Sequence, residues 1–239
     1  MTEYALYLES GPQHRKTMVH VFDLLGCIAN GPTTEAALAA TPEAIRTYLR
    51  FLQRHGEPAN PEASYTTTVA EHTTEGDWLG NGSPYAFFSP DLEPVSKAEA
   101  ETLLRRFEAL RDELASWAQA RTDTELDATP AGGGRTARGV LLHVLAVPGA
   151  YLSTALSGVT GFSRIQTQAE HGEMGLAEAL HRVAALAVER VHAATDEERR
   201  AVKQRPKEVR TLRKALRRTL EHDWEHLAEL SRRPGGPSL

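Results

Sequence analysis

A change of hydrophobic periodicity near residue 96 constrains the fold of this chain more than any other feature. Beyond it, apolar residues recur every three or four positions over long stretches, which is the period of an amphipathic helix. The first such stripe is Leu103, Phe107, Leu110, Leu114 and Trp117. Ser96 and Glu99 form a capping-box pattern in front of it. Four long helices of this kind predict a four-helix bundle over residues 95–233.

The remaining helices are predicted from the same period and from their end signals. The second begins near Thr136, and Pro148 should kink or interrupt it. The third carries the stripe Leu180, Val183, Ala187 and Val191. Thr195 opens a short helix, and the last long helix spans residues 211–232. We expect residues 234–239, which follow it, to be a disordered tail.

Residues 1–90 carry the signals of a small α/β domain instead. Runs rich in β-branched and aromatic residues predict strands at 4–8, 17–22 and 65–69. A helix is predicted from residue 33 or 34 to about residue 55, and Gly56 is placed to end it. Residues 76–94 are rich in glycine and proline and are predicted to connect the two parts. The fold class is therefore α+β, with an α/β domain followed by an all-α bundle.

Composition and charge exclude several classes of function. The chain has 239 residues and a net charge of −5, which gives no general attraction to nucleic acid or to an anionic membrane. Its first 100 residues hold 13 acidic and 6 basic side chains, so this part could meet a basic partner. The basic run at 205–218 has no interleaved aromatics, and we expect a solvated helix face there rather than a nucleic-acid site.

Cys27 is the only cysteine, so no disulfide can form within the chain, and its apolar neighbours predict a buried thiol without a catalytic role. The N-terminus lacks the pattern of a secretory signal. No stretch reaches the roughly 18 apolar residues of a membrane helix. From these features we expect a cytoplasmic protein.

Three histidines are the strongest candidates for a functional site. His222 and His226 stand four apart in the last helix, so their side chains lie one turn apart on one face. Both fall on the apolar stripe of that helix, and His143 shares a side with the apolar residues of the second helix. Inward imidazoles are costly unless they are hydrogen-bonded or metal-bound. Three histidines with an open position are a known catalytic metal arrangement.

Two points about this cluster stay open in the sequence. The three histidines could be ordinary core residues that hydrogen-bond to carbonyls or carboxylates. Asp223 and Glu225 could orient the imidazoles, although exposed charges are the favoured reading. Because Asp223 follows His222, the segment is not the His-Glu-x-x-His motif of zinc proteases. No role is assigned to the other histidines: His14, His20, His55, His72, His171, His181 and His192.

Residues 95–233 resemble the DinB/YfiT-like family of four-helix bundles. The resemblance is carried by His143 and by the segment 216–227, which contains His222 and His226. It implies that these three histidines bind a divalent metal such as nickel or zinc. It also implies relatives that use a low-molecular-weight thiol, such as mycothiol or bacillithiol, for transfer or isomerisation.

Residues 4–56 resemble a HicB-type antitoxin domain. The resemblance rests on a strand hairpin, the segment 25–31, and a helix that opens with residues 34–37 and ends in residues 48–52. It implies a small α/β fold similar to a partial ribonuclease H fold, and a protein partner such as a small toxin. No DNA-binding segment follows the domain in this chain.

Two functions follow from these observations. The first is a metal-dependent thiol transferase or hydrolase that acts on a small thiol or electrophile at the three-histidine site; its catalytic residues are not identified by the sequence. The alternative is a non-catalytic binding or regulatory protein, in which the bundle is a metal-stabilised scaffold and the first domain binds a partner. Either could be a homodimer.

Overall fold

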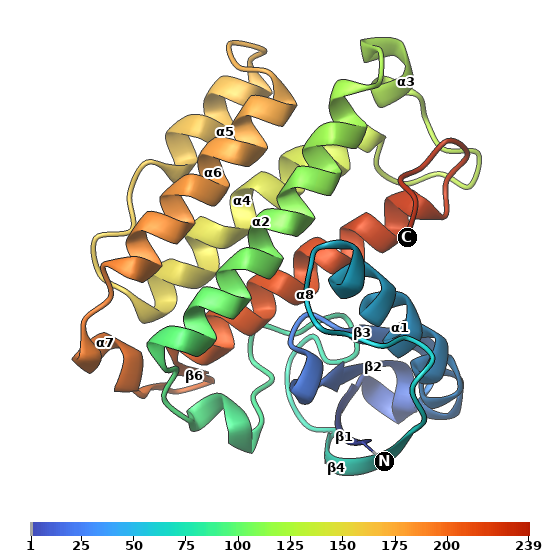
Figure 1. Ribbon diagram of the computed structural model, residues 1–239, viewed down its shortest axis with the longest axis vertical. Coiled ribbons are helices and arrows are strands. Elements are labelled where there is room, and N and C mark those ends of the chain that lie inside the picture. The colour runs from blue at the N-terminus through green and yellow to red at the C-terminus, as the bar shows by residue number, and fades with distance from the viewer. Residues whose placement is uncertain (1) are drawn as a thin grey trace.

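The computed structural model describes residues 2–239 and contains two packed parts. A small mixed sheet with one long helix forms the N-terminal part, and long helices form the rest (Figure 1). The fold class is therefore α+β. No described helix has the length and apolar character needed to cross a membrane.

Four strands build the sheet in the order β3-β2-β1-β4. They are β1 (Thr2–Ser10), β2 (Arg15–Val21), β3 (Ile28–Thr33) and β4 (Tyr65–Thr73). β2 pairs antiparallel with β1 and β3, whereas β4 pairs parallel with β1. The sequence predicted β1, β2 and β4 but not β3, because Gly31 and Pro32 in its second half are turn-forming residues.

Helix α1 (Thr34–Arg54) crosses from β3 to β4 and packs on β2 and β3. Its start is fixed by the side chain of Thr33, which accepts a hydrogen bond from Ala36 N. Gly56 follows its last turn with φ +81°, the left-handed conformation that glycine adopts without strain. Both ends of this helix are as predicted.

Four long helices lie side by side in the second part (Figure 1). They are α2 (Lys97–Gln119), α4 (Ala137–Ala155), α6 (Leu176–His192) and α8 (Leu212–Ser231). All four were predicted, as was the short α7 (Asp196–Arg200). The elements that were not predicted are α3 (Asp123–Asp127), α5 (Phe162–Glu170), and the hairpin of β5 (Lys203–Arg205) and β6 (Glu208–Arg210).

A kink or an interruption was predicted at Pro148, and the interruption does not occur, because α4 is continuous from Ala137 to Ala155. A proline in a helix removes the N–H that would bond to the carbonyl four residues earlier. That carbonyl belongs to Val144, and it accepts a hydrogen bond of 3.0 Å from Arg111 Nη2 instead. The arginine from α2 therefore satisfies the group that the proline leaves free.

The two parts share one continuous hydrophobic core. Tyr48 and Phe51 from α1 pack on Trp224 from α8, with ring centroids 4.8 and 5.4 Å apart. Arg106 of α2 forms a two-pronged ion pair of 2.7 and 2.8 Å with Glu57, just after α1. Beyond α8, the Gly235 carbonyl accepts a hydrogen bond from Trp117 Nε1.

The basic run at 205–218 is solvated at Arg205 and Lys207, as predicted, but not where it enters α8. Lys214, Arg217 and Arg218 are all buried. Arg217 pairs with Asp91 through two bonds of 2.8 Å and with Glu221, which Arg218 also contacts. Burial raises the pKa of Glu221, but Arg217, His20 and Arg218 together hold it well below its usual range. Asp91 is distant from Arg217 in the chain, and Glu221 of α8 bonds at 2.8 Å to His20 of β2, so this charged cluster connects α8 to the N-terminal part.

Candidate metal centre

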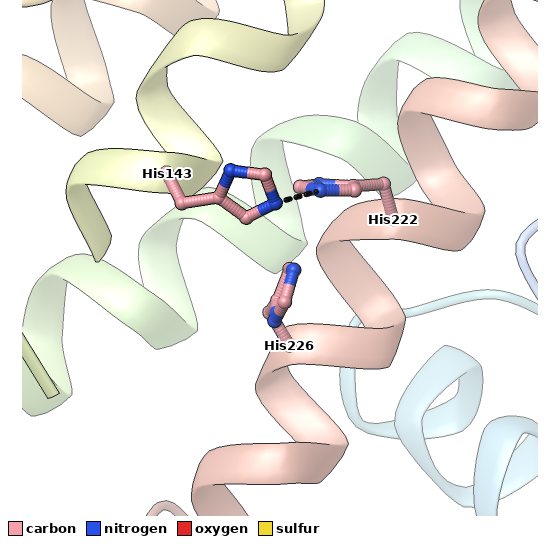
Figure 2. A group of neighbouring side chains, drawn as sticks. All are labelled: His143, His222 and His226. Carbon is pink, nitrogen blue, oxygen red and sulfur yellow. Dashed lines mark hydrogen bonds between the residues drawn. The ribbon is translucent and has the colours of Figure 1, made fainter. Parts of the chain in front are cut away.

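Three imidazoles from two helices converge in the bundle. His143 lies in the second turn of α4, and His222 and His226 lie one turn apart on α8 (Figure 2). One ring nitrogen of each lies within 4.8 Å of those of the other two. The Nε2 atoms of His143 and His222 are 3.0 Å apart. All three candidate residues named from the sequence are therefore brought together.

The environment keeps two of these imidazoles neutral. His222 and His226 are each only 8% exposed, and His143 is partly buried. Burial lowers the pKa of His222 to about 4 against the raising effect of Asp223, and the charge of His226 lowers it further. Burial, followed by the charge of His226, also lowers the pKa of His143. A neutral imidazole has a free lone pair, which is the form that binds a metal.

Glu229 orients the third imidazole. Its Oε2 lies 2.8 Å from His226 Nδ1, and its other oxygen pairs with Arg233. The hydrogen bond from His226 and the pair with Arg233 lower the pKa of Glu229, although burial alone would raise it. An ionised carboxylate accepts the Nδ1 proton of His226 and leaves Nε2 with the lone pair. Glu229 was not predicted from the sequence, where its signal is a carboxylate three residues after His226.

Asp223 is fully buried beside His222, so the favoured reading of it as an exposed charge is wrong. It forms an ion pair with Arg111, with bonds of 2.5 and 3.0 Å. Its Oδ1 lies 3.9 Å from His222 Nδ1, which has no hydrogen-bond partner among residues 2–239. Asp223 thus supplies a negative charge next to the imidazole.

Glu225 is partly buried, and it too was read as an exposed charge. Burial raises the pKa of Glu225, and Arg218 and His226 oppose that shift. The other histidines lie outside the cluster. Most are at the surface, but His20 is buried and bonds to Glu221 at 2.8 Å.

The donor set fits a divalent transition metal. It offers three imidazole nitrogens and no carboxylate within the cluster. Imidazole suits zinc, nickel, copper and iron, whereas magnesium and calcium require oxygen ligands. The Nε2 atoms of His143 and His222 are also close enough for their lone pairs to repel each other, and a bound cation would relieve that repulsion.

Comparison with known proteins assigns the helical part to a family. Residues 106–230, which are more than half of the chain, match the DinB superfamily. A similar solved structure is YfiT from Bacillus subtilis, described as a probable metal-dependent hydrolase with an unusual four-helix bundle topology. It is 23% identical to this chain, the match covers 59% of this chain and 90% of YfiT, and the TM-score is 0.43. No curated protein matches. The matched segment contains all three histidines of the cluster, and the chain belongs to the DinB superfamily.

Proposed function

We propose that His143, His222 and His226 hold one divalent metal ion, nickel or zinc, at a site that serves hydrolysis or thiol transfer. The observation that carries the proposal is the convergence of three inward imidazoles from two helices within 4.8 Å. The low pKa of His222 adds to it, because a neutral ring at neutral pH needs no proton removed before it binds metal.

The protein contributes position and environment to such a site. Glu229 fixes the tautomer of His226 through its Nδ1 proton. Arg111 holds Asp223 against the His222 side of the cluster. His143 is only partly buried, so a small ligand can approach the cluster from its side. A divalent metal supplies Lewis acidity, which lowers the pKa of a coordinated water to about 7 or removes the proton of a thiol ligand.

The first test is the metal content of the purified protein by elemental mass spectrometry. We expect about one nickel or zinc ion per chain in the wild type, because three nitrogen donors and water complete a catalytic site. The His143→Ala, His222→Ala double variant should contain none. A His181→Ala, His192→Ala variant is the control, since both residues are exposed and outside the cluster. Equal metal content in all three proteins would refute the site.

A second test separates the two reactions from each other. Thermal melting is measured with added nickel or zinc, alone and with a low-molecular-weight thiol, beside turnover of an ester and of an electrophilic thiol acceptor. Thiol-dependent stabilisation with turnover of the electrophile supports transfer. Ester turnover without a thiol supports hydrolysis.

A non-catalytic binding protein is the second candidate, and the surface beside β4 favours it. β4 is an edge strand, and its residues 66–70 are exposed. Near its end lies a groove of about 640 Å³ that contains Glu71, Glu75 and Asp77. The adjacent Trp78 is 75% exposed. An unpaired strand edge can pair with a further strand from a partner. The acidic and aromatic side chains beside this edge favour a partner strand that carries basic residues.

This candidate agrees with the resemblance of residues 4–56 to HicB-type domains, which remains a proposal. It is tested with a fluorescent peptide of alternating lysine and valine, whose binding is followed by anisotropy. Trp78→Ser and Glu75→Lys should weaken binding, and Glu178→Lys on the exposed face of α6 should not. Metal stabilisation without turnover, together with peptide binding that these variants weaken, would favour the binding protein over the enzyme.

A further inference from the structure

A second cavity, here named the interdomain pocket, lies between the two parts of the chain. It has a volume of about 480 Å³ and is formed by β3, α1, α8 and Leu239. Its apolar wall includes Ile28, Ala29, Ala44, Trp224 and Ala228. Pockets for small molecules have this size and an apolar lining, and they occur preferentially where domains meet.

Three carboxylates line this pocket, and only one of them is without a partner. Glu43 bonds to Arg50 at 3.1 Å. Glu229 is engaged by His226 and Arg233. Glu225 forms no hydrogen bond or ion pair with any residue between 2 and 239, although it is partly buried. Arg218 and His226 attract this carboxylate, but neither forms a hydrogen bond or an ion pair with it. Its oxygens can therefore accept a charge-assisted hydrogen bond from a cation that enters the pocket.

The pocket adjoins the three-histidine cluster through α8. Glu225 stands directly before His226 and three residues after His222, so it lies on the same side of the helix as His222. Glu229 belongs to both places, because it lines the pocket and holds His226 Nδ1. The three histidines do not line the pocket themselves, so a ligand bound at Glu225 would lie beside the cluster, with Glu229 between the two places.

We propose that the interdomain pocket binds an organic ammonium compound with an apolar body. Glu225 pairs with the ammonium group, and the apolar wall takes the body. An anionic ligand is disfavoured by the three carboxylates. Arg232, a cation on the pocket wall, is exposed and makes no ion pair with Glu225. Binding of this compound does not require the metal. The compound is a substrate only if the proposed function is correct.

The test compares two probes of nearly equal shape on the full chain by isothermal titration calorimetry. These are 2-phenylethylammonium and the neutral 2-phenylethanol. The ammonium compound should bind on the order of tenfold more tightly, the difference expected of one charge-assisted contact. Glu225→Gln should abolish the preference while keeping the shape of the side chain. Glu178→Gln, an exposed carboxylate of α6 that pairs with Arg182, should leave it unchanged.

Two further variants keep the proposal separate from folding and from the metal centre. Ala44→Phe reduces the volume of the pocket from the α1 side while Glu225 is kept, and it should weaken the binding of both probes. The His143→Ala, His222→Ala variant should keep the preference for the ammonium probe, because binding in the pocket does not require the metal that this variant is expected to lose. Equal binding of the two probes to the wild type, an unchanged preference in Glu225→Gln, or loss of the preference in the histidine variant would each overturn the proposal.

Discussion

Arg111 Nη2 lies 3.0 Å from both Asp223 Oδ1 and Val144 O. Asp223 follows His222 on α8, and Val144 follows His143 on α4. The fully buried side chain of Arg111 therefore joins α4 and α8, the two helices that carry the histidines. On each helix it binds the residue that directly follows a histidine. The Val144 carbonyl is free for this bond because Pro148 has no N–H to donate to it.

Asp223→Asn should destabilise the protein by about 3–5 kcal/mol, because it leaves the Arg111 charge buried without a counter-charge. The measurement is urea unfolding of the metal-free protein. The double variant Arg111→Met, Asp223→Leu is the control, and it should lose less stability because no unpaired charge remains. If Asp223→Asn were as stable as the wild type, the pair would not hold the two helices.

Glu229→Gln should weaken metal binding by roughly 10–100-fold, because the carboxylate that orients His226 becomes a neutral amide. The measurement is competition for zinc with a coloured chelator at pH 7. Folding should change little, since Glu229 lies partly at the surface. Glu178→Gln, a carboxylate of α6 far from the cluster in sequence, serves as the control. Equal zinc affinity of Glu229→Gln and the wild type would remove Glu229 from the site.

The histidine cluster could be predicted from sequence because its signal is local. The spacing of His222 and His226 places them on one helix face, and an apolar stripe marks that face as inward. The buried cations of α8 carried no such signal. Arg217 pairs with Asp91, more than a hundred positions away, and its second partner Glu221 is at the i,i+4 spacing that is also usual on exposed helix faces, so its burial has no local signal. The same holds for Asp223, whose partner Arg111 lies on another helix.

Gly26→Ala should destabilise the protein far more than Gly56→Ala. Both glycines have positive φ, +106° and +81°, so each alanine carries a backbone cost of about 1–2 kcal/mol. A Cβ at Gly26 would also lie 2.2 Å from the Tyr48 hydroxyl, whereas a Cβ at Gly56 would meet nothing within 4 Å. Thermal melting of the two variants gives the difference. Adding Tyr48→Phe should recover part of the loss in Gly26→Ala alone, and no recovery would show that the hydroxyl is not the obstacle.

Lys214 should give the protein a stability that rises with pH in the alkaline range. Burial, and next the charge of Arg217, lowers the pKa of this buried lysine to about 8, from 10.5 in the unfolded chain. Between these values the unfolded state binds more protons, so the free energy of unfolding increases with pH there, by on the order of 3 kcal/mol in total. Below pH 8 the lysine is charged in both states and this part of the stability is absent. Lys214→Met removes the titration, and the difference in unfolding free energy between wild type and variant, measured in urea from pH 7 to pH 10.5, isolates it. The unfolding free energy of the wild type should rise relative to that of the variant as the pH increases. A constant difference over this range would mean that Lys214 stays charged in the folded protein.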